Sequence, residues 1–382
     1  MSMTEHNRIH SLDFLRGLAV LLVLFRHLPT RDTSGVLHFV QTIGWTGVDL
    51  FFVLSGFLIS GLLFKDFDRY GKLDVKRFWL RRGLKIWPSY FLTYGTAMLA
   101  TALWTGNFSL LISRIPNYIF VQNYMDPAIR WTHSWSIAIE EHFYFILPLV
   151  LIVLARKKLG ELPKIALVVC VAVLLQRVLL FLITDLRWPN FYYPSHLRID
   201  SLCFGVLICY VHHYHRELFV RIAKWWPAFI AAVPLIVLAY LFPLERSAVS
   251  YTVGFTVFYL MFGGLVVAAR VHPNFGRSGP QRPLAWMGIY SYTIYLAHSV
   301  IYELPGIFTL RQMMVARAGA AGDQLLFLGL SIALGVVISH LVERPFLKLR
   351  AKWFPISPVF TPVAAATERP SAAMPAAAAL SS

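Results

Sequence analysis

The sequence predicts an all-α integral membrane protein, a helical bundle that crosses the bilayer about ten times. Hydrophobic residues make up 57% of its 382 residues and charged residues only 14%, whereas soluble domains carry about 25% charged residues. Apolar segments long enough to cross a bilayer recur along the chain. Basic residues concentrate in every second connection between them. These observations exclude a soluble globular domain.

Ten apolar windows account for the predicted spans. In chain order they are 11–29, 43–64, 87–105, 143–155, 165–184, 198–213, 226–242, 250–269, 284–304 and 324–341. The fourth window is short for a span of about 20 residues. We therefore expect its helix to begin earlier, within 135–142.

Basic residues orient the bundle. The connection after the second window holds the densest group, namely Lys65, Arg69, Lys72, Lys76, Arg77, Arg81, Arg82 and Lys85. Basic residues also follow the fourth, sixth, eighth and tenth windows, whereas the other connections contain few. Because cytoplasmic loops are enriched in Lys and Arg, these five connections are predicted to be cytoplasmic. Both chain termini are then cytoplasmic as well.

The chain divides into three predicted parts. A short cytoplasmic segment (1–10) precedes the membrane domain (11–352), and a Pro/Ala-rich tail (353–382) follows it. We expect this tail to be disordered, because its composition offers little apolar surface to bury.

The net charge and the cysteines indicate neither a nucleic-acid partner nor a bound metal. A net charge of +16 in a membrane protein is explained by cytoplasmic loops that face anionic lipid, so we expect no nucleic-acid partner. Cys170, Cys203 and Cys209 lie in apolar windows. They show no disulfide or metal-ligand spacing, and we expect no bound metal.

The first window carries four ionisable residues, Asp13, Arg16, Arg26 and His27. A charge inside a bilayer costs free energy, so such residues are functional-site candidates by default. Arg16 and His27 are eleven positions apart, which puts both on one helix face, about 16 Å apart along the axis. A simpler interpretation is that Asp13 and Arg16 pair with each other.

The other polar candidates fall into two groups, one predicted at the outer side of the membrane and one at the inner side. The predicted topology puts one group toward the outside: Asp49, Trp135, Glu140, Arg198, Asp200 and His298. A histidine with a carboxylate beside it suits general acid–base catalysis. The inner group is basic and includes Arg81, Arg82 and Lys85, which suits binding of a polyanion.

Structural roles explain several of these residues equally well. Arg198 and Asp200 could form an ion pair that joins two helices, and His298 could be a structural histidine. The inner basic group could serve only to set topology. Glu141 and His142 are expected to face the aqueous loop, because adjacent residues point in different directions on a helix.

Several motifs in order resemble the membrane acyltransferase-3 family of bacterial enzymes. The Arg16–His27 spacing resembles its Arg-x10-His motif, and the similarity covers roughly 10–350. Similar elements are "GVDLFFVLSGFLIS", "FWLRRGLKIWPSYF", "WSIAIEEHFY", "RIDSLCFG", "SYTIYLAH" and "ERPF". Lys85 stands where the family commonly has an arginine, and a lysine cannot reproduce a bidentate arginine contact.

The resemblance implies transfer of an acyl group, usually acetyl, from acyl-CoA to a hydroxyl of a glycan, lipid-linked sugar or other glycosylated acceptor. Acyl-CoA is then a co-substrate, and no permanently bound cofactor is expected. The implied location is the bacterial inner membrane. By matching positions, Arg16 and His27 become the leading functional residues, followed by Glu140 and the group Arg81, Arg82 and Lys85.

These expectations combine into a mechanism. Arg16 and the inner basic group would hold the CoA phosphates, and the pantetheine arm would bring the thioester to His27. His27 would act as general base, oriented by Glu140 or Asp49; a transient acyl-histidine is the alternative.

The remaining candidates have supporting roles. Trp135 or Arg26 would stabilise the oxyanion. Arg198, Asp200 and His298 are candidates for contacts with the acceptor.

A transporter or flippase is the alternative from another functional class, because it too would place charges inside a bundle. Such proteins typically contain inverted repeats with helices broken at corresponding positions. We find no such symmetry in the sequence. Substrate flux without CoA turnover would identify a transporter, whereas acyl-CoA hydrolysis or transfer would identify an enzyme.

The predicted topology can be tested by thiol labelling in cells. A cysteine introduced at Lys72 should react with a membrane-impermeant reagent only after the membrane is permeabilised, because its connection is predicted to be cytoplasmic. A cysteine at Ala318 should react in intact cells. The reverse labelling pattern would invert the orientation of the whole bundle.

Overall fold

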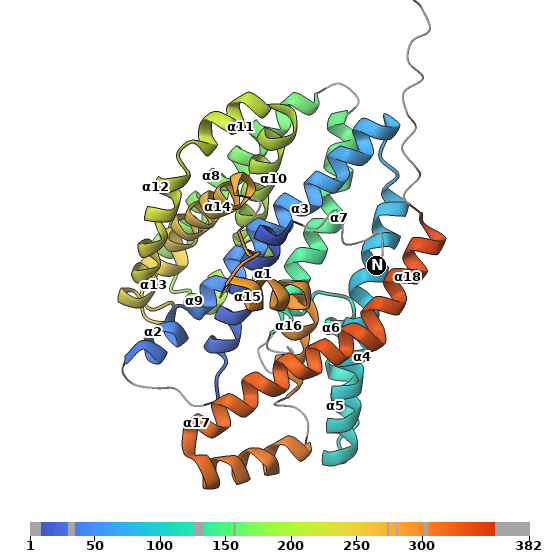
Figure 1. The fold of residues 1–382 in the computed structure, drawn as a ribbon, viewed down its shortest axis with the longest axis vertical. Coiled ribbons are helices and arrows are strands. Elements are labelled where there is room, and N and C mark those ends of the chain that lie inside the picture. The colour runs from blue at the N-terminus through green and yellow to red at the C-terminus, as the bar shows by residue number, and fades with distance from the viewer. Residues whose placement is uncertain are drawn as a thin grey trace, which may run out of the picture.

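A computed structural model describes residues 9–29, 35–125, 133–155, 158–272, 275–279, 281–301 and 305–355. Within these ranges all regular structure is helical, and the helices pack into one bundle (Figure 1). The all-α prediction is confirmed for this part of the chain. Most of the predicted N-terminal segment (1–8) and tail (356–382) lies outside the described residues.

The helices of nine residues or more make up most of the bundle. They are α1 (His10–Arg26), α2 (Gly35–Ile43), α3 (Gly47–Tyr70), α4 (Val75–Thr105), α7 (Trp135–Ala155), α8 (Leu162–Ile183), α10 (Ile199–Tyr214), α14 (Phe255–Val271), α15 (Gln281–Ile289), α16 (Ser291–Val300), α17 (Pro305–Ile338) and α18 (Arg344–Trp353).

Shorter helical pieces connect them. The short α-helices are α5 (Ser109–Ser113), α6 (Ile115–Tyr118), α9 (Trp188–Tyr192), α11 (Arg216–Ala223), α12 (Trp226–Ala231) and α13 (Val237–Leu241). Single 3-10 turns lie at Gly44–Thr46, Gln122–Tyr124, Leu159–Glu161, Ser195–Leu197 and Val233–Ile236. Two π-helical turns, Ser250–Gly254 and Ser339–Glu343, precede α14 and α18.

Each of the ten predicted windows falls on helix, but the number of spans is not confirmed. Five described helical stretches are long and apolar enough to cross a membrane: Gly35–Tyr70, Trp135–Leu154, Leu159–Ile183, Ser250–Val271 and Thr309–Trp353. Arg216–Ala223 and Trp226–Leu241, which meet at 55°, would add a sixth as one broken span. These helices mark the protein as a membrane protein, and the count of about ten spans stays a prediction.

Short or interrupted helices account for three of the windows outside these stretches, namely 11–29, 198–213 and 284–304, whereas 87–105 lies on the long helix α4. α1 has 17 residues and α10 has 16, so each is shorter than a full span of about 20 residues. The window 284–304 is divided at Tyr290 into α15 and α16. In the window 226–242, a 3-10 turn with Pro234 separates α12 from α13; proline lacks the N–H that a continuous helix needs.

Two helix starts bear on the site. α4 begins at Val75, well before residue 87, because the Asp74 side chain caps it by accepting a hydrogen bond from the Arg77 backbone N–H at 2.9 Å. The basic residues that follow are therefore on a regular helix. α7 begins at Trp135, which confirms the expected start within 135–142.

Glycines let the central helices approach to backbone contact. A Cβ on Gly17 of α1 would lie 1.8 Å from the carbonyl oxygen of Leu284, and one on Gly288 of α15 would lie 1.7 Å from that of Asp13. Figure 1 shows α1 and α15 together near the middle of the bundle. Small residues allow such close crossings in membrane bundles.

A second crossing joins α3 to α10 in the same way. A Cβ on Gly56 would lie 2.0 Å from the carbonyl oxygen of Leu202, and one on Gly205 would lie 2.3 Å from that of Val53. α1 also packs against α3 and α16. The two glycine crossings therefore hold α1, α3, α10 and α15 together as the centre of the bundle.

Replacing Gly17 with alanine should destabilise the protein, although alanine is the better helix former by about 1 kcal/mol. The added methyl group would overlap the Leu284 carbonyl, and such overpacking typically costs about 1–3 kcal/mol. The measurement is the melting temperature of the purified protein in detergent. Gly329→Ala is the control, because Gly329 is exposed on α17 with open space around it. Equal melting temperatures for the two variants would contradict the proposed contact.

Candidate functional site

A cavity of about 390 Å³ lies inside the bundle. Basic side chains from four helices line it: Arg16 on α1, Lys65 on α3, Arg82 and Lys85 on α4, and Arg270 on α14. Glu140 on α7 is the one carboxylate among the described lining residues. Five positive charges against one negative charge make the cavity suited to a polyanion. Lys65 is predicted only as a basic residue of a cytoplasmic connection, and Arg270 is not among the candidates from the sequence.

A hydrogen-bonded network connects the basic wall to Glu140. Arg82 donates to the hydroxyl of Tyr144 at 2.8 Å, with its guanidinium carbon 4.4 Å from the centre of that ring. The Tyr144 hydroxyl donates to Ser55 at 3.3 Å, and Ser55 donates to Glu140. Glu140 thus faces the cavity as part of the group that holds Arg82 in place.

The expectation that Glu141 faces the aqueous loop is wrong. Its side chain is buried, and the indole N–H of Trp87 donates to it at 2.9 Å. α7 packs against both α3 and α4, so the adjacent carboxylates of Glu140 and Glu141 both point into the bundle. His142 is half-buried, with its Nδ1 2.7 Å from Ser195 Oγ.

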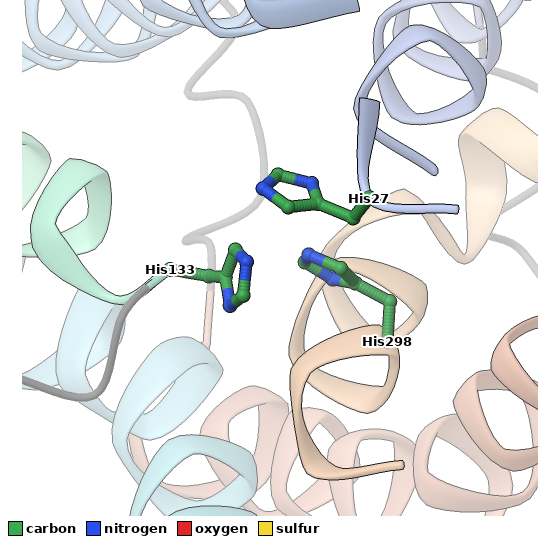
Figure 2. Close-up of side chains that lie close together, drawn as sticks. All are labelled: His27, His133 and His298. Carbon is green, nitrogen blue, oxygen red and sulfur yellow. The ribbon is translucent and has the colours of Figure 1, made fainter. Parts of the chain in front are cut away.

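Three histidines from distant parts of the chain meet in one cluster. His27 lies at the end of α1, His133 lies just before α7, and His298 lies on α16 (Figure 2). Their ring centres are 4.1 Å apart for His27 and His133, 5.1 Å for His27 and His298, and 4.8 Å for His133 and His298. His27 and His298 are both candidates from the sequence, whereas His133 is not. The available signal was its position two residues before Trp135 in "HSWSIAIEEHFYF".

Backbone carbonyls orient two of these rings. Nδ1 of His27 lies 2.8 Å from the carbonyl oxygen of Val23, and Nδ1 of His298 lies 2.5 Å from that of Tyr295. A carbonyl oxygen can only accept, so both Nδ1 atoms carry the proton and both Nε2 atoms keep a lone pair. From the sequence we expect Glu140 or Asp49 to orient His27. In the structure the Nδ1 of His27 contacts the Val23 carbonyl, Glu140 accepts from Ser55, and Asp49 pairs with Arg198.

Tyr295 lies between the cavity and the histidine cluster. Its hydroxyl donates to the carbonyl oxygen of His133 at 2.7 Å and lies 2.6 Å from Ser136 Oγ. Tyr295 and Ser136 both line the cavity, and the Tyr295 ring centre is 5.2 Å from that of His298. The histidine cluster therefore adjoins the wall of the basic cavity.

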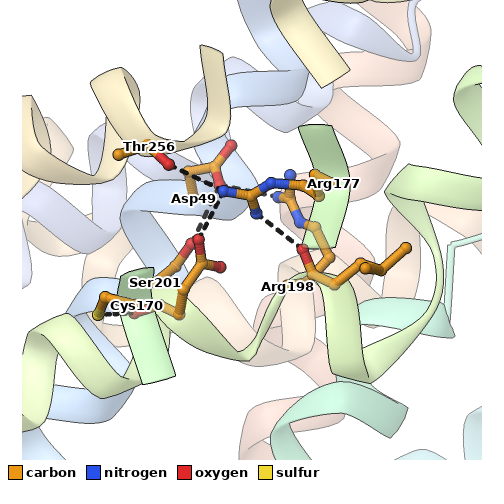
Figure 3. A network of polar contacts seen from close by, with 8 residues as sticks. Asp49, Cys170, Arg177, Arg198, Ser201 and Thr256 are labelled. Carbon is orange, nitrogen blue, oxygen red and sulfur yellow. Dashed lines mark hydrogen bonds and ion pairs between the residues drawn. The ribbon is translucent and has the colours of Figure 1, made fainter. Parts of the chain in front are cut away.

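Asp49, Arg198 and Asp200 belong to a separate network of buried ion pairs, and Figure 3 shows Asp49, Arg177 and Arg198 in it. Arg198 pairs with Asp49 on α3 at 2.8 Å, and Arg177 on α8 pairs with Asp200 on α10, also at 2.8 Å. All four side chains have 0% exposure. The Arg198 guanidinium also lies 3.7 Å from the ring centre of Phe255.

The structure thus pairs Arg198 and Asp200 with residues of neighbouring helices rather than with each other. The two pairs tie α3 and α8 to the start of α10. The sequence analysis misses Arg177, although an arginine within an apolar window is itself a signal. This network includes none of the three clustered histidines.

The remaining candidates have packing or pairing contacts. Trp135 is buried, with the ring of Tyr192 at 4.4 Å and that of Phe52 at 6.1 Å between centres. Arg26 forms an ion pair with Glu245. Arg81 donates to the backbone carbonyl of Phe354 and is not among the residues that line the cavity.

Curated relatives of the chain are bacterial O-acetyltransferases. The O-acetyltransferase OatA of Staphylococcus aureus is 26% identical over 321 residues, which cover 75% of this chain and 49% of that protein. The peptidoglycan O-acetyltransferase OatA of Listeria monocytogenes is 28% identical over 329 residues, 79% of this chain and 51% of that protein. The chain thus spans about half the length of the relatives that it matches. No solved structure matches the chain significantly.

The family model described as an acyltransferase domain matches residues 9–344. This range includes the basic cavity, the histidine cluster and the buried ion pairs. It confirms the resemblance seen in the ordered motifs, from Arg16 and His27 on α1 to the segment that begins α18. The chain therefore belongs to the membrane acyltransferase-3 family.

Proposed function

We propose that the chain transfers an acyl group, most simply acetyl, from acyl-CoA to a hydroxyl of a glycan or another glycosylated acceptor. One observation carries the proposal: a cavity lined by five basic side chains adjoins a cluster of three histidines. α1 contributes to both, with Arg16 in the cavity and His27 in the cluster. Membership of an acyltransferase family favours this activity over transport.

The basic cavity supports acyl-CoA as the donor. Coenzyme A carries several phosphate charges, and arginine and lysine bind phosphate through charge-assisted hydrogen bonds. Arg16 on α1 and Arg82 and Lys85 on α4 line the same cavity, and the first turns of α4 belong to the predicted cytoplasmic connection. The nucleotide would stay near the cytoplasmic face while the acyl end reaches toward Tyr295 and Ser136.

The histidine cluster supports activation of the acceptor hydroxyl. Attack on a thioester needs the hydroxyl proton to be removed, and an imidazole that titrates near neutral pH is suited to this. The contact of the His27 Nδ1 with the Val23 carbonyl favours the tautomer in which Nε2 is the basic nitrogen. In the predicted topology this end of α1 faces outward. The acceptor would therefore enter from outside, across the inner membrane from the CoA nucleotide.

The relatives guide the choice of acceptor. The protein from Listeria monocytogenes is named a peptidoglycan O-acetyltransferase. A cell-wall or other extracytoplasmic glycan is therefore our proposed acceptor class. The test is to incubate membranes with labelled acetyl-CoA and to identify the labelled product by mass spectrometry. Label recovered only in free acetate would count against a glycan acceptor.

Arg16→Ala should weaken acyl-CoA binding. Loss of one charge-assisted contact costs about 1.5–3 kcal/mol, or about 10- to 150-fold in Kd. Binding is measured on the purified protein in detergent. Arg221→Ala is the control, because Arg221 is exposed on α11 and does not line the cavity. Unchanged affinity in Arg16→Ala would make Arg16 a structural residue, most simply the partner of Asp13.

His27→Ala should reduce transfer by about 100- to 10,000-fold, the usual contribution of a group that activates a nucleophile. Acyl-CoA binding should stay near normal, because His27 is not among the residues that line the cavity. The measurement is the transfer rate at saturating donor. His215→Ala is the control, because His215 is exposed at the end of α10. A His27→Ala rate above about a tenth of the wild-type rate would remove His27 from the mechanism.

A further inference from the structure

We propose that His27, His133 and His298 together bind one zinc ion. Each offers one ring nitrogen, and these three nitrogens lie within 4.8 Å of one another. In Figure 2 the three rings surround a common space from three sides. The residues are 106 and 165 positions apart in sequence, so no spacing motif could have revealed the group. The earlier expectation of no metal rested only on the cysteines and on local spacing.

The geometry is close to that of a zinc site. Zinc takes histidine nitrogens at about 2.0–2.1 Å, which puts two ligand nitrogens about 3.4 Å apart in a tetrahedral site. Nitrogens within 4.8 Å of each other therefore need to approach by at most about 1.4 Å. Side-chain torsion changes, above all in His133, are the expected source of a movement of this size.

One ring nitrogen of His298 and one of His133 are buried without a hydrogen-bond partner among the described residues. His298 has 0% exposure, and its Nε2 has no hydrogen-bond partner among the described residues. The Nδ1 of His133 is likewise buried without a partner in the described part of the chain. A buried acceptor without a donor is costly, and each such case calls for an explanation such as an ion. A cation shared by the rings would satisfy both nitrogens.

Hydrogen bonds orient two of the rings in the way that is usual for metal-binding histidines. Histidines that bind a metal through one nitrogen usually donate the other N–H to a backbone carbonyl or carboxylate. His27 and His298 do this with the carbonyls of Val23 and Tyr295. Tyr295 also holds the His133 backbone through its hydroxyl. Two rings are thus already fixed in the tautomer that leaves Nε2 for a metal.

The choice of zinc follows from the ligand set. Imidazole suits zinc and its neighbours among the transition metals, whereas magnesium and calcium prefer oxygen. Three histidines with a fourth position left for an exogenous ligand is a known arrangement of catalytic zinc. Among the described residues, no cysteine or carboxylate joins the group to close the fourth position.

The zinc ion would also explain why the reaction needs His27. This step of the inference rests on the proposed acyl transfer. The acceptor hydroxyl would bind at the fourth position, where zinc lowers the pKa of a bound hydroxyl. Its proton passes to water, and the oxygen forms the ester bond with the acyl carbon. The carbon–sulfur bond breaks, and CoA leaves as a thiolate that takes up a proton. His27 then acts as a ligand to the ion rather than as a base.

The test is metal binding by the full chain, purified in detergent with a tag that contains no histidine. After treatment with a chelator, the protein is titrated with Co²⁺, and the visible bands of tetrahedral cobalt are followed. We expect one ion per chain, displaced by one equivalent of Zn²⁺. His133→Ala and His298→Ala should each weaken binding by about 100-fold or more, whereas His215→Ala should bind as the wild type does.

Each outcome decides between the proposals. Absence of a tetrahedral cobalt spectrum in the wild type, or equal binding by the wild type and His133→Ala, would overturn the zinc site. If transfer still depended on His27 in that case, the proposed function would stand with His27 as a lone general base. Binding of one ion through the three histidines without any acyl transfer would support the site and refute the function. The melting temperature of each variant separates ligand loss from misfolding.

Discussion

The close crossing of α1 and α15 is the contact on which the site depends. Gly17 and Gly288 bring the two backbones together at the level of Arg16. α1 runs from there to His27, while α15 leads through the turn at Tyr290 into α16, which carries His298. One crossing point therefore fixes the basic cavity at one end of α1 and two of the three clustered histidines at the other. A shift of α15 along α1 would separate His298 from His27.

The buried ion pairs join α3 and α8 to the start of α10 through electrostatic attraction. The free-energy cost of desolvating two charges can exceed their Coulombic attraction, so a buried ion pair needs good geometry and further hydrogen bonds. Arg177 has both, because it also donates to the Leu197 carbonyl and to Thr256, each at 2.8 Å. The result is a rigid start to α10, next to the glycine crossing with α3. Backbone contact thus positions α15 against α1, whereas both backbone contact and paired charges position α10 against α3.

The sequence predicts local features of this protein well and its tertiary pairings poorly. Helix periodicity is a local property, so the shared face of Arg16 and His27 and the positions of all ten windows follow from the residues alone. The partner of Asp49 depends on how α3 meets α10, and nothing in either segment specifies Arg198 over other cations. His133 precedes α7, and only the packing of α7 and α16 brings it beside His27. The count of about ten spans stays a prediction, because hydropathy alone does not report features such as the break at Tyr290 that divides the window 284–304.

The contacts of Tyr295 also bear on the permeability of the membrane. In the proposed topology, the basic cavity opens toward the cytoplasm and the histidine cluster toward the outside. Water-filled spaces that approach each other from both faces would conduct protons and dissipate the membrane potential unless something divided them. The Tyr295 hydroxyl, held by Ser136 and the His133 backbone, lies at that boundary. If the proposed function holds, this phenol would help to keep the proton gradient of the cell intact during each transfer.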